Sequence, residues 1–181
     1  MKLKNSATIE DLYLVDGKAE LVNGKLVCEP PTGGAPSSAS FEIAVSLRAY
    51  AKRTGYGRAV ADNAGFQVNL PNRKSFSPDA AFYTGPYTGM KFFEGAPIFA
   101  VEVRSEGDYG GQAEQKMADK RRDYFAAGTL VVWDVDLLGE DVVRVYRANG
   151  PETPTVYQRG EMAEAEPAVP GWYMPVDDLF G

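Results

Sequence analysis

The spacing of apolar and polar residues changes several times along the chain, and each change predicts a different element. Residues 18–29 alternate around Asn23-Gly24, the dipeptide preferred in two-residue hairpin turns, and so predict a β-hairpin. Nearly continuous apolar runs are typical of strands that are covered on both faces. Runs and alternating segments together predict strands at 58–70, 76–83, 97–105, 129–136, 141–147 and 155–160, the first of them as one strand or a bent pair with a break near Gly65.

Helical spacing and capping residues predict the remaining regular structure. A short helix is expected over 6–15, with Ser6 or Thr8 as its N-cap, and a well-buried one over 38–53, because its apolar residues cover more than one face. A further helix at 112–127 is closed by Gly128, and the last residues form a helical turn. Loops are expected at 30–37, 85–95, 106–111 and 161–173. This order predicts one α/β (α+β) domain over 1–181, a mixed β-sheet flanked by helices.

The helix at 112–127 carries a lysine in an unusual place. Ala113, Met117 and Tyr124 form an apolar stripe, and Lys120 falls in the middle of it. A lysine that faces a sheet loses hydration unless carboxylates receive its ammonium group. The alternative is that its stem lies along the edge of the core while its charge stays in water. Lys116, one turn earlier, is a second candidate for the same position.

Two carboxylates are candidates to receive this lysine. Asp79 follows Pro78 in one predicted strand, and Glu102 lies in the apolar run of another. Carboxylates on neighbouring strand ends can share one hard divalent cation through oxygen ligands. Such a cation can lower the pKa of a water and offset charge on a phosphoryl oxygen. With a lysine nearby, the pattern resembles the constellation that cuts phosphodiester bonds in one large nuclease superfamily.

Composition removes several other classes of mechanism. The chain has no histidine, which excludes histidine-dependent triads and histidine metal sites, and its single Cys28 is expected to be a small core residue. The net charge of −6 argues against a module that only binds nucleic acid, because such modules are usually basic. No apolar run is long enough for a membrane helix, and the polar start Met1 to Asn5 lacks the apolar core of a signal peptide. We expect a cytoplasmic protein with no membrane contact.

Several motifs in a fixed order resemble one known family, the Uma-type (Uma-two) endonucleases of the PD-(D/E)XK restriction-endonuclease-like superfamily. The resemblance covers about residues 6–180. Its motifs are Glu20-Leu-Val-Asn-Gly24, Ser77-Pro78-Asp79-Ala80-Ala81-Phe82, Val101-Glu102-Val103-Arg104-Ser105, Lys120-x-x-x-Tyr124-x-x-x-Gly128 and Trp133-Asp134-Val135-Asp136.

The resemblance implies a restriction-endonuclease-like fold and a Mg²⁺-dependent site, with Mn²⁺ as a substitute. Asp79 and Glu102 would be metal ligands, and Lys120 would orient water or stabilise the charge of the transition state. Arg104 stands where the superfamily usually has its lysine. It would contact a phosphate or pair with an acid, since it cannot act as a base at neutral pH. The implied substrate is nucleic acid, by analogy DNA, and a homodimer would suit the cutting of duplexes.

Other residues have a functional and a structural interpretation. Glu20 would complete the metal site, or it is a solvated strand carboxylate. Asp134 and Asp136 end a buried strand as a D-x-D pair, which can hold a metal, or they are acids of the kind that is common at strand exits for structural reasons. Six basic residues would flank a nucleic-acid groove or simply be solvated: Arg48, Lys52, Arg53, Arg58, Arg73 and Lys74. The alternative function for the whole chain is a catalytically silent interaction or dimerisation module, in which the acids and Lys120 form a structural ion-pair cluster.

Overall fold

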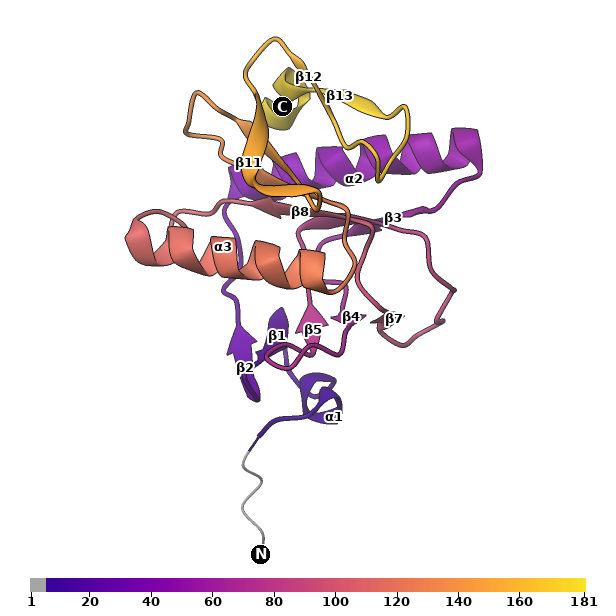
Figure 1. Cartoon of the computed structure of the whole chain (residues 1–181), viewed down its shortest axis with the longest axis vertical. Helices are drawn as coiled ribbons and strands as arrows, with labels where there is room; N and C mark the ends of the chain where they lie inside the picture. The colour runs from indigo at the N-terminus through magenta and orange to yellow at the C-terminus, as the bar shows by residue number, and fades with distance from the viewer. Residues whose placement is uncertain (1–5) are drawn as a thin grey trace, which may run out of the picture.

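The centre of the computed structural model, which describes residues 6–181, is a six-stranded mixed sheet with the order β11-β10-β9-β8-β6-β3 (Figure 1). β8 and β9 run parallel, and the other neighbours are antiparallel. The strands are β3 (Arg58–Ala61), β6 (Ala80–Tyr83), β8 (Phe99–Val103), β9 (Val131–Val135), β10 (Val143–Arg147) and β11 (Gly150–Tyr157).

The two long helices cover opposite faces of this sheet (Figure 1). α2 (Gly34–Thr54) lies on one face with the C-terminal segment, where Phe99, Val101 and Trp133 point into the larger core. α3 (Gly111–Ala126) lies on the other face. Because side chains alternate along a strand, Glu102 points to the face opposite Val101 and Val103. The sheet therefore presents Glu102 to α3.

Three smaller sheets complete the fold. β4 (Phe66–Gln67), β5 (Ser75–Phe76) and β7 (Phe93–Glu94) form one of them beside α3, and β12 (Met162–Glu164) pairs with β13 (Tyr173–Pro175) above α2. The predicted strands at 58–70 and 76–83 are thus each split in two. Ser77-Pro78-Asp79 makes the second break, between β5 and β6, and Asp79 stands directly before β6.

The predicted hairpin at 18–29 is confirmed as the third small sheet, with β1 (Ala19–Val22) paired to β2 (Lys25–Cys28). Asn23 and Gly24 both have positive φ, 50° and 70°, as a type I′ turn requires. Two backbone hydrogen bonds connect the hairpin to the segment before β5. Asn23 N–H donates to the carbonyl of Asn72 at 2.6 Å, and Lys74 N–H donates to the carbonyl of Leu21 at 2.8 Å. The hairpin is thereby held beside α3.

Cys28 corrects a sequence-based expectation, because it is exposed rather than a core residue. β2 pairs with β1 alone and is mostly exposed, while β1 buries Glu20 and Leu21. A two-stranded hairpin has too little covering structure to bury the alternating face of both strands.

Helix boundaries follow the capping signals, with one exception. Thr8 and Asp11 form a capping box at α1 (Ile9–Leu12), and Gly55 ends α2 in the left-handed conformation. α2 begins at Gly34, four residues before the expected start, because Pro36 is tolerated in a first helical turn whose N–H groups have no intrahelical partner. Its buried residues follow one face, whereas Phe41 and Val45 are exposed.

β11 begins at Gly150, five residues before the predicted strand at 155–160, and ends at Tyr157. This strand lies at the edge of the six-stranded sheet, and its Pro151 and Pro154 fall in the irregular stretch between Gly150 and Thr155 that has no register partner in β10. The final helical turn is confirmed as a 3₁₀ helix, η1 (Val176–Phe180). No helix among residues 6–181 is long and apolar enough to cross a membrane, and Met1 to Asn5 lie outside the described residues.

Candidate active site

Asp79 and Glu102 lie side by side at the end of the β6–β8 pair. Ala80 is the partner of Val101, so the antiparallel register places Asp79 opposite Glu102. Two hydrogen bonds to the backbone of β8 fix Asp79. Its N–H donates to the carbonyl of Val101 at 3.0 Å, and its Oδ2 accepts from Val103 N–H at 2.7 Å. The two carboxylates predicted as metal ligands are therefore neighbours.

Lys120 reaches the same place from α3. Its Nζ lies 2.8 Å from Glu102 Oε2 and 2.9 Å from Glu20 Oε1, and only 14% of the side chain is exposed. Burial alone would lower the pKa of Lys120, but the charges of Glu102 and Glu20 outweigh burial and raise it above its ordinary value. Lys120 is therefore a charged donor at neutral pH, not a base.

Glu20 is buried in the site rather than solvated on the hairpin. Its Oε1 accepts from Ser77 N–H at 2.8 Å, and its Oε2 accepts from Arg73 Nη1. Burial raises the pKa of Glu20, but Lys120 and Arg73 outweigh it and hold this pKa below its usual value.

Arg73 corrects the expectation of a surface basic residue. It is buried between Glu20 and Asp123, and its Nε donates to Asp123 Oδ2 at 2.8 Å. Asp123 and Arg121 lie outside the apolar stripe of α3, yet both contact neighbouring elements, and the guanidinium of Arg121 lies 4.0 Å from the ring centre of Tyr146. The inner face of α3 is thus broader than the stripe of Met117, Lys120 and Tyr124.

Lys18 is a second lysine in the site, and sequence reasoning missed it. Its Nζ lies 2.6 Å from Asp79 Oδ1, 2.9 Å from Asp62 Oδ1 and 3.3 Å from Glu29 Oε2. Glu29 also approaches Lys120, with 3.9 Å between Oε1 and Nζ. The five acids Glu20, Glu29, Asp62, Asp79 and Glu102 are called the acidic cluster below.

The charges of the acidic cluster are only partly balanced. Five carboxylates face the ammonium groups of Lys18 and Lys120, while Arg73 is shared with Asp123 outside the cluster. Burial raises the pKa of Glu102 to about 7; the negative charges of Asp79 and Glu20 also raise it, against the opposing effect of Lys120. Additional positive charge would therefore be stabilising here.

Tyr124 orients Glu102 from the helix side. Its hydroxyl donates to Glu102 Oε1 at 2.7 Å. Burial and the charge of Glu102 raise the pKa of Tyr124 well above its usual value, so the phenol keeps its proton. Its ring stacks on Phe76 with 4.0 Å between centroids, which fixes the hydroxyl. Both oxygens of Glu102 are thus held by residues of α3.

Arg104 and Lys116, the remaining accessory candidates, lie apart from the acidic cluster. Arg104 donates from Nε and Nη2 to Asp134, both at 2.8 Å, and also binds Glu114. It therefore pairs with acids, one of the two roles expected for it, and the pairing gives Asp134 a structural partner. Lys116 is exposed on α3. No ion pair connects it to the acidic cluster in the described part of the chain.

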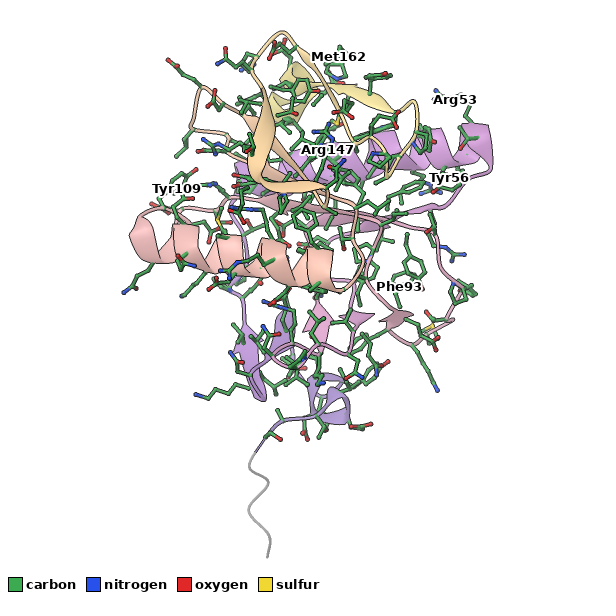
Figure 2. All side chains as sticks on the ribbon, viewed as in Figure 1. Arg53, Tyr56, Phe93, Tyr109, Arg147 and Met162 are labelled. Carbon is green, nitrogen blue, oxygen red and sulfur yellow. The ribbon has the colours of Figure 1, made fainter. Side chains whose placement is uncertain are left out.

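Asp136 ends β9 and holds the loop that follows it. Its Oδ1 accepts from Tyr109 Oη at 2.8 Å and from the N–H groups of Leu138 and Gly139 at 3.0 and 3.1 Å. Tyr109 comes from the loop before α3, at the end of the helix far from Phe93 (Figure 2). Asp136 thus links two loops, which supports its structural interpretation.

The stability of the protein should depend on the charge of Asp136. Burial raises the pKa of Asp136, but the hydrogen bonds from Tyr109 and Leu138 outweigh burial and lower it. A carboxylate with a lowered pKa stabilises the fold above its unfolded pKa, and this contribution is lost as the pH falls through the folded value. We expect Asp136→Asn to lower the free energy of unfolding by about 1–2 kcal/mol at pH 7, and the difference to shrink below pH about 4. Urea denaturation at pH 7 and below pH about 4 measures the difference in free energy of unfolding. Exposed Asp178→Asn is the control, and an equal loss for Asp136→Asn at low pH would contradict the prediction.

The donor chemistry of Asp79 and Glu102 fits a hard divalent cation. Mg²⁺ is usually held by one or two carboxylates, with water and substrate phosphate completing its shell. However, no group of three or more acidic side chains among residues 6–181 is arranged to hold a metal ion directly. The oxygens of the acidic cluster turn instead toward Lys18 and Lys120.

Comparisons with known proteins identify the family of the chain. Residues 8–177 match the model of the Uma2 family, described as "Putative restriction endonuclease". A solved structure described as a putative nuclease belonging to DUF820, from Anabaena variabilis, is similar with a TM-score of 0.74 and 19% identity. The match covers 96% of this chain and 97% of that one. No curated protein is similar enough to match.

The chain thus has a restriction-endonuclease-like fold and belongs to the Uma2 family. Both conclusions confirm expectations from the sequence. The roles of Asp79, Glu102 and Lys120 in catalysis stay predictions.

Proposed function

We propose that the protein is a metal-dependent endonuclease that hydrolyses phosphodiester bonds. The observation that carries this proposal is that Asp79, directly before β6, meets Glu102 of β8 and Lys120 of α3 in one partly buried site. Membership of a family described as restriction endonucleases supports it. The absence of histidine from the sequence leaves carboxylates and lysines to carry the chemistry.

Each residue has a distinct part in this proposal. Asp79 and Glu102 would hold the cation, with Val103 N–H and Tyr124 Oη keeping one oxygen of each in place. A bound Mg²⁺ would lower the pKa of a water and offset charge on the phosphoryl oxygens. Lys120 would donate from its charged ammonium group to the oxygen on which negative charge develops. Glu20 would position Lys120.

The substrate we propose is DNA, and the cation is Mg²⁺ with Mn²⁺ as a substitute. We also propose that the protein acts in the cytoplasm, with two copies of the chain cooperating on a duplex. The choice of DNA as substrate rests on the family, and the choice of cation rests on the oxygen-ligand chemistry of the site.

Lys120→Met should reduce Mg²⁺-dependent cleavage of DNA by about 10²–10³-fold, because the variant removes a charged donor from the site and keeps a side chain of similar length. Lys116→Met is the matched control, since Lys116 is exposed on the same helix, one turn away. Cleavage rates on single-stranded, duplex and branched DNA measure the effect. Equal losses for both variants would contradict the assignment of Lys120.

A catalytically silent ion-pair cluster would give a different result when melting temperature and cleavage are measured with Mg²⁺. A cation that binds only the folded state raises the melting temperature by mass action, by an amount equivalent to about 2.7 kcal/mol at a hundred times its Kd. We expect millimolar Mg²⁺ to produce such a rise. No cleavage of any substrate together with no rise in melting temperature would favour the interaction module.

A further inference from the structure

Lys18 occupies the part of the acidic cluster that faces Asp79. With 13% of its side chain exposed, it forms ion pairs with Asp79, Asp62 and Glu29, and the shortest of these joins Nζ to Asp79 Oδ1 at 2.6 Å. The proposed reaction uses Asp79 but leaves Lys18 without a role. A buried ammonium group in direct contact with a proposed metal ligand calls for a physical account.

The contacts of Asp79 show what this lysine does to a cation site. Val103 N–H donates to Asp79 Oδ2, and Lys18 Nζ donates to Asp79 Oδ1, so each carboxylate oxygen already accepts a hydrogen bond. A backbone N–H leaves its acceptor free to bind a cation through its other lone pair. The ammonium group of Lys18, by contrast, lies 2.6 Å from Asp79 Oδ1 and repels an incoming cation by its charge. This repulsion is strong where solvent is largely excluded.

We infer that Lys18 is an internal cation that competes with the divalent metal for Asp79. In the free protein its ammonium group balances the charge of Asp79, and the metal binds only when this group moves away from Oδ1. This inference rests on the proposed function, because it concerns the same metal site.

The other two partners of Lys18 make this movement short. Asp62 Oδ1 and Glu29 Oε2 already lie 2.9 and 3.3 Å from Nζ, so the ammonium group keeps two carboxylates when it leaves Asp79. It is never left buried and unpaired, which would be costly. Lys18 therefore reduces metal affinity without blocking the site, and it stays beside the metal as a second positive charge.

The test measures metal binding rather than cleavage. Isothermal titration of the full chain with Mg²⁺, and separately with Mn²⁺, would compare the wild type with Lys18→Met and Lys18→Gln. Gln keeps a hydrogen-bond donor near Asp79 without the charge, so it provides a second variant if Met impairs folding. Lys25→Met is the matched control, because it removes one positive charge from an exposed position of the same hairpin.

We expect both Lys18 variants to bind the metals about 10- to 100-fold more tightly than the wild type, the size of effect that groups around metal ligands usually have. Lys25→Met should stay close to the wild type. A Kd for the Lys18 variants equal to that of Lys25→Met, or weaker binding, would overturn the inference and leave the proposed function standing. No metal binding by any of the four proteins would overturn the metal dependence itself, and the inference with it.

Discussion

Asp79→Asn is expected to reduce Mg²⁺-dependent cleavage by roughly 10³-fold, equivalent to about 4 kcal/mol of transition-state stabilisation. Asn has nearly the same shape and can still accept the hydrogen bond from Val103 N–H. It lacks the negative charge that a hard cation requires from its ligand. The variant should therefore fold and also lose the rise in melting temperature that Mg²⁺ produces.

Two measurements make the result for Asp79→Asn specific. Asp119→Asn, at an exposed position on α3, controls for the loss of one carboxylate. Circular dichroism reports whether each variant is folded. If folded Asp79→Asn retained cleavage within about tenfold of the wild type, Asp79 would not be an essential metal ligand.

Arg73→Met should have the largest effect on stability, a loss of about 3–5 kcal/mol in the free energy of unfolding. The guanidinium of Arg73 is only 7% exposed and lies between Glu20 and Asp123. Its removal would leave Glu20 with less compensating charge in a buried position. Lys74→Met, at the adjacent residue, should cost less than about 1 kcal/mol, because the amine of Lys74 bonds to Asn69 in an exposed position.

A double variant separates lost charge balance from lost packing. Arg73→Met combined with Glu20→Gln should regain part of the stability, because the uncompensated carboxylate is then neutral. Equal urea midpoints for the single and the double variant would show that the guanidinium acts mainly through its contacts with Phe76 and Asp123. If Arg73 served only to bind nucleic acid, neither variant would lose stability.

The sequence predicts the sheet well because its central strands have a simple pattern. β8 and β9 are nearly continuous apolar runs, and Asn23-Gly24 is a strong hairpin signal. The start of α2 was less predictable, since glycines and a proline at 33–36 resemble a loop until the first turn of a helix is considered. Cys28 was misplaced because alternation alone does not say which strand of a hairpin is covered.

The site was only partly predictable, because several of its charges come from residues that look solvated. Asp79, Glu102 and Lys120 stand out by their positions in buried elements. Lys18 does not, yet the hairpin turn contains a usable signal: its register pairs Ala19 with Cys28, which puts Lys18 opposite Glu29. Spacing by two also puts Lys18 on the face of Glu20.

The two prolines of β11 have a consequence for how copies of the chain can associate. A strand at the end of a sheet normally offers a row of N–H and C=O groups to a strand of another molecule. Pro151 and Pro154 have no N–H to donate and lie in the irregular stretch of β11, so this edge is a poor template for a sheet shared between two copies. Two copies of the chain would therefore not join their sheets through β11, and the six-stranded sheet would not extend through this edge into a polymer.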